Sequence, residues 1–285
     1  MKWFKETLHA DWQQHLKQEN ILYESNSAHQ HVIIFENKLF GRVLALDHIV
    51  QLTEKDEFIY HEMFAHVPVF AHGQAQHILI IGGGDGGILR ELLRHPTIEQ
   101  IDIVEIDDTV ISMCQKFFPM VEQNAFSDSR VKVHIDDGSQ FVQKTSHQYD
   151  LILVDSTDPI GPAKCLFESA FYQHCLARLK PKGILVTQNG NTFCQLDELQ
   201  QTYHRFKALT SNYGFYVSVV PTYIGGMMSH AWASNDRMLS DIDPDDLKYR
   251  FQQAGLEMKY YNPAIHLGAF ALPQYVWNAF NQNKH

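Results

Sequence analysis

The sequence predicts an α/β protein in which a doubly wound, Rossmann-like sheet follows a small antiparallel β-region. Three observations carry this prediction. Residues 21–53 alternate apolar and polar side chains between turn-like stretches, which is typical of an antiparallel β-meander. From residue 78 onward, short apolar runs alternate with helical patterns, which indicates parallel strands covered by helices on both faces. A glycine cluster, GGGDGG at residues 82–87, joins the first apolar run to the first of these helices, as in nucleotide-binding folds.

The N-terminal β-meander domain is expected over residues 1–55. Residues 1–19 are largely polar, with the aromatic side chains Trp3, Phe4 and Trp12, and indicate a short strand or arm. The following alternation of period two predicts four strands. They are Ile21–Glu24, His31–Glu36, Arg42–Leu46 and Ile49–Thr53. Helical spacing then predicts a helix over Asp56–His66, after which Pro68 and Gly73 lead into the sheet.

The second domain, residues 56–285, is expected to contain the doubly wound sheet and its helices. Its strands are predicted at Ile78–Ile81, Ile101–Val104, Val131–Ile135, Leu151–Val154 and Ile184–Thr187. Its helices are predicted near Ile88–Arg94, Thr109–Phe118, Ser139–Lys144, Ser169–Leu179, Leu196–Asn212 and Asp243–Ala254. Val217–Val220 and Met228–Ala233 indicate an antiparallel pair added to the sheet, and Leu256–Tyr260 a last short strand.

Composition excludes several classes of protein. The net charge of −10 argues against binding to nucleic acid or to an anionic membrane surface. No apolar run approaches the roughly 20 residues of a membrane-spanning helix, and the first residues lack the apolar centre of a signal peptide. The four cysteines show no C-x-x-C spacing, which favours buried, reduced thiols. A cytoplasmic enzyme is therefore expected.

Acidic side chains follow the predicted parallel strands at the ends where doubly wound sheets bind ligands. They are Asp85, Glu105, Asp136, Asp137, Asp155 and Asp158. Any one of them could equally be a helix N-cap or a turn residue, but together they predict one anionic crevice. Asp85 lies inside the glycine loop, where it would repel a pyrophosphate and attract a cation. The expected ligand is a nucleoside that carries a positive group.

Several side chains near these strand ends receive a role from their position alone. Asp137 is placed to accept a hydrogen bond from an adenine amino group, and Gly138 would let the ring approach closely. Asp136 is interpreted as the N-cap of the helix from Ser139. Asp155 and Asp158 are three residues apart and can face one cavity. Residues 160–162, rigid at Pro162 and pliable at Gly161, suit a lid, although a plain connection between strand and helix is the alternative.

Further candidates lie outside the glycine loop. Tyr60 and His61 are neighbours on the helix before the sheet, so at most one of them can point straight into the pocket. Gln188 ends the fifth strand, and Tyr223 lies on the loop at residues 221–226. The histidines show no metal-binding spacing such as H-E-x-x-H, so no metal site is expected.

Five motifs in order give the chain a specific resemblance. They are IIGGGDGG (Ile80–Gly87), VEID (Val104–Asp107), DDG (Asp136–Gly138), DSTDPIGP (Asp155–Pro162) and PTY (Pro221–Tyr223). The sequence resembles the polyamine aminopropyltransferases, most closely the spermidine synthases. The resemblance extends over nearly the whole chain, from HQHVIIFEN at residues 29–37 to FALPQY at residues 270–275. It implies a Rossmann-like domain of the methyltransferase type and a homodimer or homotetramer.

The resemblance also implies a reaction. An aminopropyl group would pass from decarboxylated S-adenosylmethionine, a co-substrate, to putrescine, giving spermidine and 5'-methylthioadenosine, without a cofactor. It implies that the methylthioadenosine part is held by Gln30, Glu105, Asp137, Gly138 and Pro162. Asp85 would bind the amine of the aminopropyl arm, and Asp155 would accept the proton of the attacking amine. The polyamine would be bound by Tyr60, His61, Asp85, Asp155, Asp158, Gln188 and Tyr223. Many relatives carry Gln where this chain has His61.

Other functions compete with this interpretation. A methyltransferase using ordinary S-adenosylmethionine would need a group to receive the amino acid carboxylate, and Asp85 has the wrong charge. The same charge disfavours an NAD-dependent dehydrogenase, whose cofactor carries a pyrophosphate. A polyamine-binding protein without catalysis is disfavoured because Asp155 and the two tyrosines Tyr60 and Tyr223 are all present. Within the family, spermine or thermospermine synthesis stays open.

Overall fold

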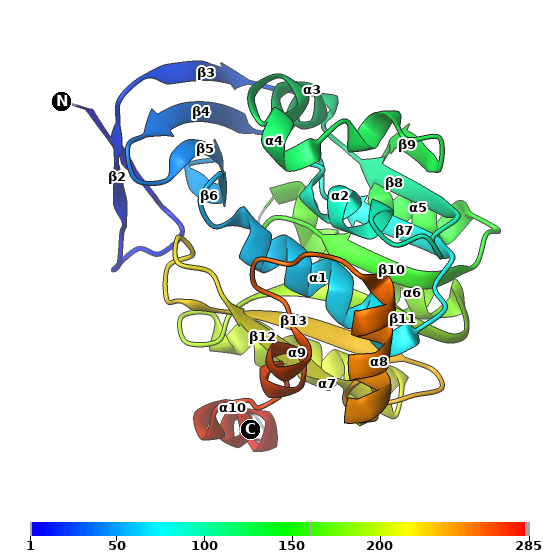
Figure 1. Cartoon of the computed structure of the whole chain (residues 1–285). Coiled ribbons are helices and arrows are strands. Elements are labelled where there is room, and N and C mark those ends of the chain that lie inside the picture. The colour runs from blue at the N-terminus through cyan, green and yellow to red at the C-terminus, as the bar shows by residue number, and fades with distance from the viewer. Residues whose placement is uncertain (1, 160, 283–285) are drawn as a thin grey trace.

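The computed structural model describes residues 2–159 and 161–282, without the side chains of Gly161 and Pro162 (Figure 1). Three sheets are present in this part of the chain. A two-stranded antiparallel sheet is formed by β1 (Lys2–Lys5) and β2 (His15–Gln18). A four-stranded antiparallel meander contains β3 (Ile21–Asn26), β4 (His31–Asn37), β5 (Gly41–Leu46) and β6 (Ile49–Thr53). The four strands predicted for this region are confirmed.

The third sheet has seven strands in the order β12-β13-β11-β10-β7-β8-β9. They are β7 (His77–Gly82), β8 (Gln100–Glu105), β9 (Val131–Ile135), β10 (Tyr149–Asp155), β11 (Leu179–Asn191), β12 (Asn212–Val219) and β13 (Met227–Ser234). Only β13 runs antiparallel to its neighbours β11 and β12. The strand order reverses between β7 and β10, and such a switch point is where doubly wound sheets bind ligands. The predicted fold class is confirmed.

Helices cover both faces of this sheet. They are α1 (Glu57–His72), α2 (Gly87–Leu93), α3 (Asp108–Phe117), α4 (Pro119–Glu122), α5 (Gly138–Lys144), α6 (Ser169–Ala177), α7 (Leu196–Leu209), α8 (Pro244–Ala254), α9 (Pro263–Ala269) and α10 (Gln274–Asn281). Along β7, Ile78 and Ile80 pack toward α1 and α8, while Leu79 and Ile81 pack toward α6 and α7. This alternation explains why the central strands are apolar throughout. Figure 1 shows α1 and α8 on the near face.

The meander lies against the larger sheet's helices. Val32 and Ile34 of β4 pack with Leu44 of β5 against Val110 and Phe118, which belong to α3 and the residue that follows it. The opposite face of the meander packs against the β1–β2 hairpin through Phe4, Leu16, Ile33, Phe35 and Val43. Both faces of β4 are therefore buried, and the meander is held to the rest of the molecule by apolar contact.

Two predictions about local structure are wrong. The helix expected to end at His66 continues through Pro68 to His72, where Gly73 ends it with a left-handed φ of 84°. Pro68 removes one N–H from the helix, but the buried surroundings of α1 keep the segment helical. Leu256–Tyr260 is not a strand. Its last N–H groups and that of Tyr261 donate to the Glu62 carboxylate at 2.7–2.8 Å, so no strand partner is needed.

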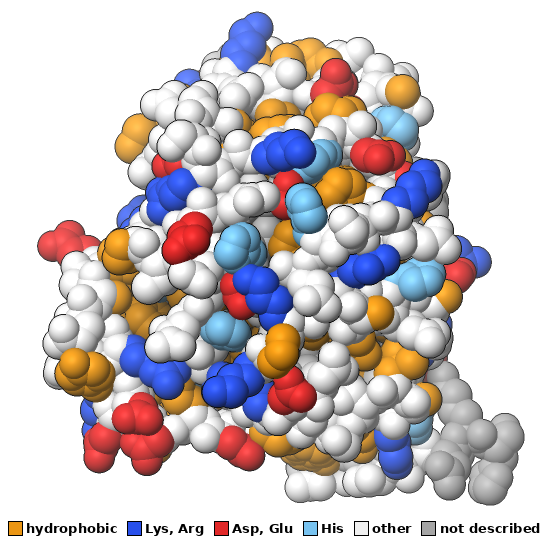
Figure 2. Space-filling model, turned by 90° about the vertical axis from the view of Figure 1, so that its right-hand side faces the viewer, with side chains coloured by type: hydrophobic (Ala, Val, Ile, Leu, Met, Phe, Trp, Pro, Cys, Tyr) orange, Lys and Arg blue, Asp and Glu red, His pale blue; other side chains and the backbone are white. Residues whose placement is uncertain are grey.

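The C-terminal helices α9 and α10 were not predicted, because each is too short for a clear period. The short 3₁₀ turns η1 (Ala125–Ser127), η2 (Gly161–Phe167) and η3 (Leu239–Asp241) complete the described chain. None of the helices in residues 2–159 and 161–282 has the length and apolar composition needed to cross a membrane. On the described part of the face in Figure 2, basic, acidic and histidine side chains are interspersed and apolar ones are scattered.

Candidate active site

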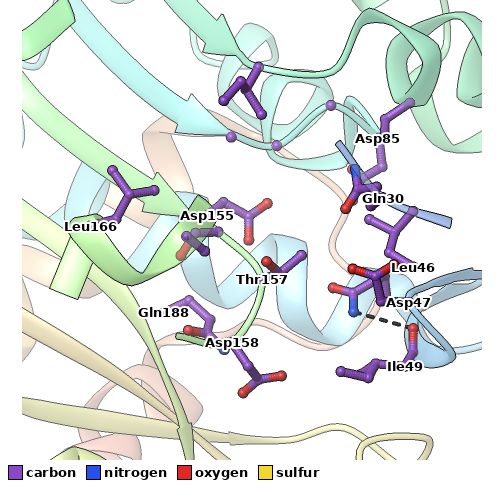
Figure 3. Close-up of a pocket in the computed structure, with 18 of the residues that line it drawn as sticks. Gln30, Leu46, Asp47, Ile49, Asp85, Asp155, Thr157, Asp158, Leu166 and Gln188 are labelled. Atoms are coloured by element: carbon purple, nitrogen blue, oxygen red, sulfur yellow. Dashed lines mark hydrogen bonds between the residues drawn. The ribbon is translucent and has the colours of Figure 1, made fainter. Parts of the chain in front are cut away.

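One cavity of about 310 Å³ lies at the carboxyl ends of β7, β8, β10 and β11. The meander supplies part of its wall through Gln30, Leu46, Asp47 and Ile49 (Figure 3). Five of the six acids predicted to converge line this cavity, namely Asp85, Glu105, Asp137, Asp155 and Asp158, whereas Asp136 does not. The volume suits a small-molecule ligand. The site therefore combines a nucleoside-sized space with several carboxylates.

The glycine turn after β7 brings two strand ends into contact. Gly82 has a φ of +82°, and a Cβ there would lie 2.0 Å from the carbonyl oxygen of Asp155. The N–H of Gly83 donates to that same oxygen at 3.1 Å. Only glycine permits this approach. As a result the Asp85 loop and the Asp155 carboxylate face the same space, as Figure 3 shows.

Asp155 ends β10 and is held from α1. The Tyr60 hydroxyl donates a 2.6 Å hydrogen bond to Oδ1 of Asp155. Burial raises the pKa of the Asp155 carboxyl to about 7, and the nearby Asp85 charge adds to this rise. Tyr223 lies edge-on to Tyr60, with ring centroids 5.8 Å apart, and its own hydroxyl donates to the carbonyl of Gln51 in β6. The two tyrosines thus form one wall around a carboxyl group that can exchange a proton near neutral pH.

His61 lies elsewhere than predicted. It is 2% exposed and does not line the cavity. Its Nδ1 lies 2.6 Å from Oε2 of Glu57, and its Nε2 lies 3.4 Å from Oδ1 of Asp85. Because neighbouring helix residues diverge by about 100°, Tyr60 faces the cavity and His61 turns beneath the glycine loop. His61 therefore contacts the site through Asp85 and does not line the cavity, contrary to the prediction.

The end of β8 forms the second part of the site. Burial raises the pKa of the Glu105 carboxyl to about 7, and Glu105 accepts a hydrogen bond from the N–H of Asp107. Asp107 in turn accepts from Thr109 N at the start of α3, from the Ser27 hydroxyl at 2.6 Å and from Gln30 Nε2 at 3.0 Å. These bonds tie the β3–β4 loop to the start of α3. They place Gln30 at the cavity wall, as Figure 3 shows.

The N-cap of α5 is Asp137, and the expectation that Asp136 fills this place is wrong. Oδ1 of Asp137 accepts from the N–H groups of Ser139 and Gln140 at 2.8 and 3.2 Å. The helix starts one residue earlier than expected, at Gly138, and this shifts the cap by one position. A Cβ at Gly138 would lie 2.2 Å from Cγ2 of Ile81. Glycine is therefore needed here for packing against β7, whatever ligand approaches.

The far end of the cavity contains a second group of acids. Asp158 is 9% exposed and accepts from Nε2 of Gln195 at 2.5 Å. Burial raises the pKa of Asp158, and burial followed by the Asp158 charge raises the pKa of Glu198 to about 7. Glu6, from the β1–β2 hairpin, also lines the cavity, and burial raises its pKa to about 6. Burial disfavours the ionised form of all three carboxyl groups, so a cation bound between them would stabilise that form.

Glu6, Gln195 and Glu198 were missed by sequence reasoning. Oε1 of Glu6 accepts from the Val50 N–H, while its buried Oε2 has no hydrogen-bond partner among the described residues. Gln188, a predicted residue that lines the cavity, likewise leaves its buried Oε1 without one in that set. Glu6 stands alone in a polar N-terminal stretch, so no local pattern marked it. Only the long-range fold brings it to Asp158.

Two further predictions concern Pro162 with the expected lid, and metal binding. The side chain of Pro162 lies outside the described residues, as does Ile160 of the expected lid, although the backbone of Pro162 belongs to η2. In the described part of the chain, no three His, Cys, Asp or Glu side chains are arranged to hold a metal ion.

The fold and the cavity together define a class. A Rossmann-like sheet of the methyltransferase type carries a nucleoside-sized cavity whose glycine loop and strand ends present carboxylates in place of groups that bind phosphate. Comparison with known families agrees. A family model described as "Spermine/spermidine synthase domain" matches residues 57–243, and one described as "Spermidine synthase tetramerisation domain" matches residues 2–54. The chain belongs to the spermine/spermidine synthase family of polyamine aminopropyltransferases.

Individual relatives are similar over almost their full length. The chain is 50% identical to the polyamine aminopropyltransferase of Pseudomonas syringae pv. tomato over 279 residues, covering 98% of each chain. It is 50% identical to that of Serratia proteamaculans over 282 residues, covering 99% of this chain and 98% of the relative. The crystal structure of spermidine synthase from Thermotoga maritima matches with a TM-score of 0.91 at 35% identity, covering 98% of this chain and 94% of that one.

A crystal structure of spermidine synthase in complex with the transition state analogue AdoDATO matches with a TM-score of 0.93 at 36% identity. The match covers 98% of this chain and 94% of that chain. This protein is therefore a transferase, an aminopropyltransferase of polyamine biosynthesis.

Proposed function

We propose that this enzyme transfers the aminopropyl group of decarboxylated S-adenosylmethionine to putrescine, releasing spermidine and 5'-methylthioadenosine. The observation that carries the proposal is the distribution of carboxylates in one cavity. Asp85 in the glycine turn after β7 and Asp155 at the end of β10 line one end of the cavity, where Gly82 packs against the Asp155 backbone, and Asp158 and Glu6 lie toward the other end. A diamine acceptor has two ammonium groups to satisfy, and a donor without a carboxylate suits a loop that contains Asp85.

In this proposal the reaction forms one bond and breaks another. The attacking amine nitrogen bonds to the methylene beside the donor's sulfonium, and the carbon–sulfur bond breaks with its electron pair moving to sulfur. Methylthioadenosine leaves as a neutral thioether, and the proton lost by nitrogen passes to Asp155. The leaving group is already activated by its positive charge, so the chemistry requires no metal ion or redox cofactor.

The amine must lose a proton before it can attack. An alkylamine has a pKa of ~10.4, so exposing its lone pair at pH 7 costs roughly 4.6 kcal/mol. Carboxylates around the amine favour its charged form and raise this cost, while burial and the nearby sulfonium lower it. Asp155, whose pKa is raised to about 7 by burial, is matched to accept the proton at neutral pH. Tyr60 would hold its Oδ1, leaving Oδ2 for the amine.

The remaining groups are assigned to binding. Gln30, Glu105, Asp137 and Gly138 line the donor part of the cavity and would contact the methylthioadenosine moiety. Asp85 would bind the amine of the aminopropyl arm. At the other end, Asp158, Glu6 and Gln188 would hold the acceptor's distant ammonium, with Glu198 behind them. Tyr223 would close the wall between the two ends.

We also propose that the enzyme works as a homodimer or homotetramer. The match of residues 2–54 to a domain described by its role in tetramerisation supports this. So does the exposure of Trp3, Trp12, Ile21 and Leu39 on the N-terminal sheets, since large apolar side chains at a surface often meet a second subunit. Light scattering at micromolar concentration should report two or four subunits, and a monomer would contradict the proposal.

Initial rates test the reaction. Decarboxylated S-adenosylmethionine should be turned over with putrescine, with methylthioadenosine and spermidine formed in equal amounts. Cadaverine, agmatine and spermidine, offered as alternative acceptors, measure how strictly the far end of the cavity selects length. If none of the four acceptors yields methylthioadenosine, the proposed function is wrong. If spermidine is the best of them, the enzyme makes a longer polyamine and only the acceptor assignment is wrong.

A further inference from the structure

His61 lies between two carboxylates, one at each ring nitrogen. Nδ1 lies 2.6 Å from Oε2 of Glu57, one turn earlier in α1, and Nε2 lies 3.4 Å from Oδ1 of Asp85 in the glycine loop. A neutral imidazole has one N–H donor and one acceptor nitrogen. In this geometry the acceptor nitrogen of a neutral ring would face a carboxylate oxygen, and the lone pairs of the two atoms would repel each other. Only the imidazolium, with two N–H donors, satisfies both contacts.

The groups around His61 support a fixed positive charge. On α2, Arg90 donates to the Glu57 carboxylate from both terminal nitrogens, Nη1 at 3.2 Å and Nη2 at 3.0 Å. The buried charges therefore alternate along Arg90, Glu57, His61 and Asp85. Burial lowers the pKa of His61, but Asp85 and Glu57 together outweigh it and raise the pKa to about 10. Asp155 on β10 is a further charged group that interacts with His61, and the Tyr60 ring packs edge-on against the imidazole.

The same contacts fix how Asp85 is oriented. Its Oδ1 accepts from the N–H of Gly87 at 2.6 Å and faces His61 Nε2, so Oδ2 is left to the cavity. A Cβ at Gly87 would lie 2.2 Å from both Cε1 and Nδ1 of His61, so the ring is packed directly against the start of α2. Burial raises the pKa of Asp85, but the charge and hydrogen bond of His61 bring it below its usual range.

We propose that His61 is a positioning residue, a permanently protonated imidazolium that keeps the Asp85 carboxylate ionised and turned toward the amine of the donor. This inference rests on the proposed function only in naming that amine as what Asp85 binds. His61 is buried and does not line the cavity, so it acts through Asp85. The positive charge also offsets Asp85 beside Asp155, where two uncompensated carboxylates would repel each other.

The protonation state can be measured without any substrate. ¹⁵N NMR of the histidine rings, with His61 assigned by the signals lost in His61→Gln, should show two imidazolium-type nitrogens up to about pH 9, whereas a free histidine is largely neutral above about pH 7.5. One N–H nitrogen paired with one bare nitrogen, the pattern of a neutral imidazole, would overturn the proposal. This result is independent of whether the enzyme uses the substrates proposed above.

Kinetics test the link to Asp85. Glutamine is neutral, so in His61→Gln the Asp85 carboxyl loses the charge that lowers its pKa, and its pKa rises. Asp85 must be ionised to bind an ammonium group, so donor affinity, measured by isothermal titration calorimetry without an acceptor, should be lost at a higher pH in His61→Gln than in wild type as the solution is acidified. At neutral pH we expect KM for the donor to rise by about tenfold, with a smaller fall in kcat at saturating donor.

His66→Gln is the matched control. His66 lies on the same helix, is also buried and also contacts a carboxylate, Glu91 at 2.9 Å, but it does not line the cavity or touch the glycine loop. Its variant should keep the wild-type pH profile and donor KM. A donor KM and pH profile in His61→Gln equal to those of wild type would overturn the proposal. So would the same changes in His66→Gln. If wild type itself transfers no aminopropyl group, the proposed function fails, and the NMR measurement still decides the state of His61.

Discussion

The Tyr60 hydroxyl donates a 2.6 Å hydrogen bond to Oδ1 of Asp155. This contact joins α1, which precedes the large sheet, to the end of β10 at the sheet's switch point. It fixes one oxygen of a carboxyl group whose pKa burial raises to about 7. The group proposed to accept the proton is therefore oriented by the helix next to it and tuned by its burial.

Replacing Asp155 or Asp158 by asparagine should change different kinetic constants. Asp155→Asn keeps the shape but removes the base, so kcat should fall by about two to four orders of magnitude. Asp158→Asn should chiefly raise KM for putrescine, because it removes binding that is the same in the ground and transition states. A monoamine acceptor should be poor with wild type and little worse with Asp158→Asn. Equal losses of kcat, with KM unchanged in both variants, would contradict this division.

The rate should depend on pH through Asp155. The carboxyl must be unprotonated to accept a proton, and its pKa is raised to about 7, so kcat/KM should increase as pH rises through that value and be lost below it. The Tyr60 hydrogen bond lowers the pKa of Asp155. In Tyr60→Phe the acid limb of the pH profile, where kcat/KM falls on acidification, should therefore move to higher pH. Tyr172→Phe, a buried tyrosine on α6 away from the cavity, should leave the limb in place.

The donor should be recognised by the absence of a carboxylate. Because Asp85 lines the cavity in the glycine loop, S-adenosylmethionine should bind at least about tenfold more weakly than its decarboxylated form, a difference of ~1.4 kcal/mol or more. Asp85→Asn removes the repulsion between Asp85 and the carboxylate of S-adenosylmethionine. It should therefore reduce the difference in affinity between the two ligands. Isothermal titration calorimetry with both ligands measures this difference in affinity. If wild type binds both ligands equally well, Asp85 does not select against the donor's carboxylate.

Gly138 should be required for stability. In Gly138→Ala the new Cβ would lie 2.2 Å from Cγ2 of Ile81, and the strain should lower the free energy of unfolding by about 1–3 kcal/mol. Gly268→Ala is the control, because a Cβ at this position in α9 meets nothing within 4 Å and alanine favours a helix. Chemical denaturation of the apo proteins compares the two. The close approach is not essential if both variants unfold at the wild-type midpoint.

Removal of residues 1–53 should give insoluble protein. The meander covers Val110, Cys114 and Phe118, which would then be exposed to solvent along α3 and its end. It also supplies Gln30, Leu46 and other parts of the cavity wall, so any soluble fraction should be inactive. Expression and sedimentation of residues 54–285 test this. A soluble core with wild-type turnover would show that the meander is dispensable.

Local sequence patterns were sufficient for the order of the central strands and for the acids that line the cavity after them. Apolar runs such as Ile78–Ile81 form buried strands in any parallel sheet, because both of their faces must leave water. Once the strands are parallel, their carboxyl ends meet at one edge. The convergence of Asp85, Glu105 and Asp155 follows from this topology without further information.

Other features depend on contacts between distant parts of the chain. Pro68 reads as a helix end, yet tertiary packing keeps α1 helical around it. Residues 259–261 have a strand-like sequence, but Glu62 takes their N–H groups. The local backbone structure at these positions depends on which hydrogen-bond partner lies near each N–H group in the folded protein. The neighbouring residues in the sequence do not specify that partner.

The direction of individual side chains also required the tertiary structure. The sequence alone determined that acids after strands β7, β8 and β10 line one cavity, because the period and order of strands are visible in short segments. It could not decide whether Tyr60 or His61 enters the cavity, since that depends on how α1 is rotated against the sheet. Nor could it bring Glu6 to Asp158, because a contact across about 150 residues of sequence exists only after the core has packed.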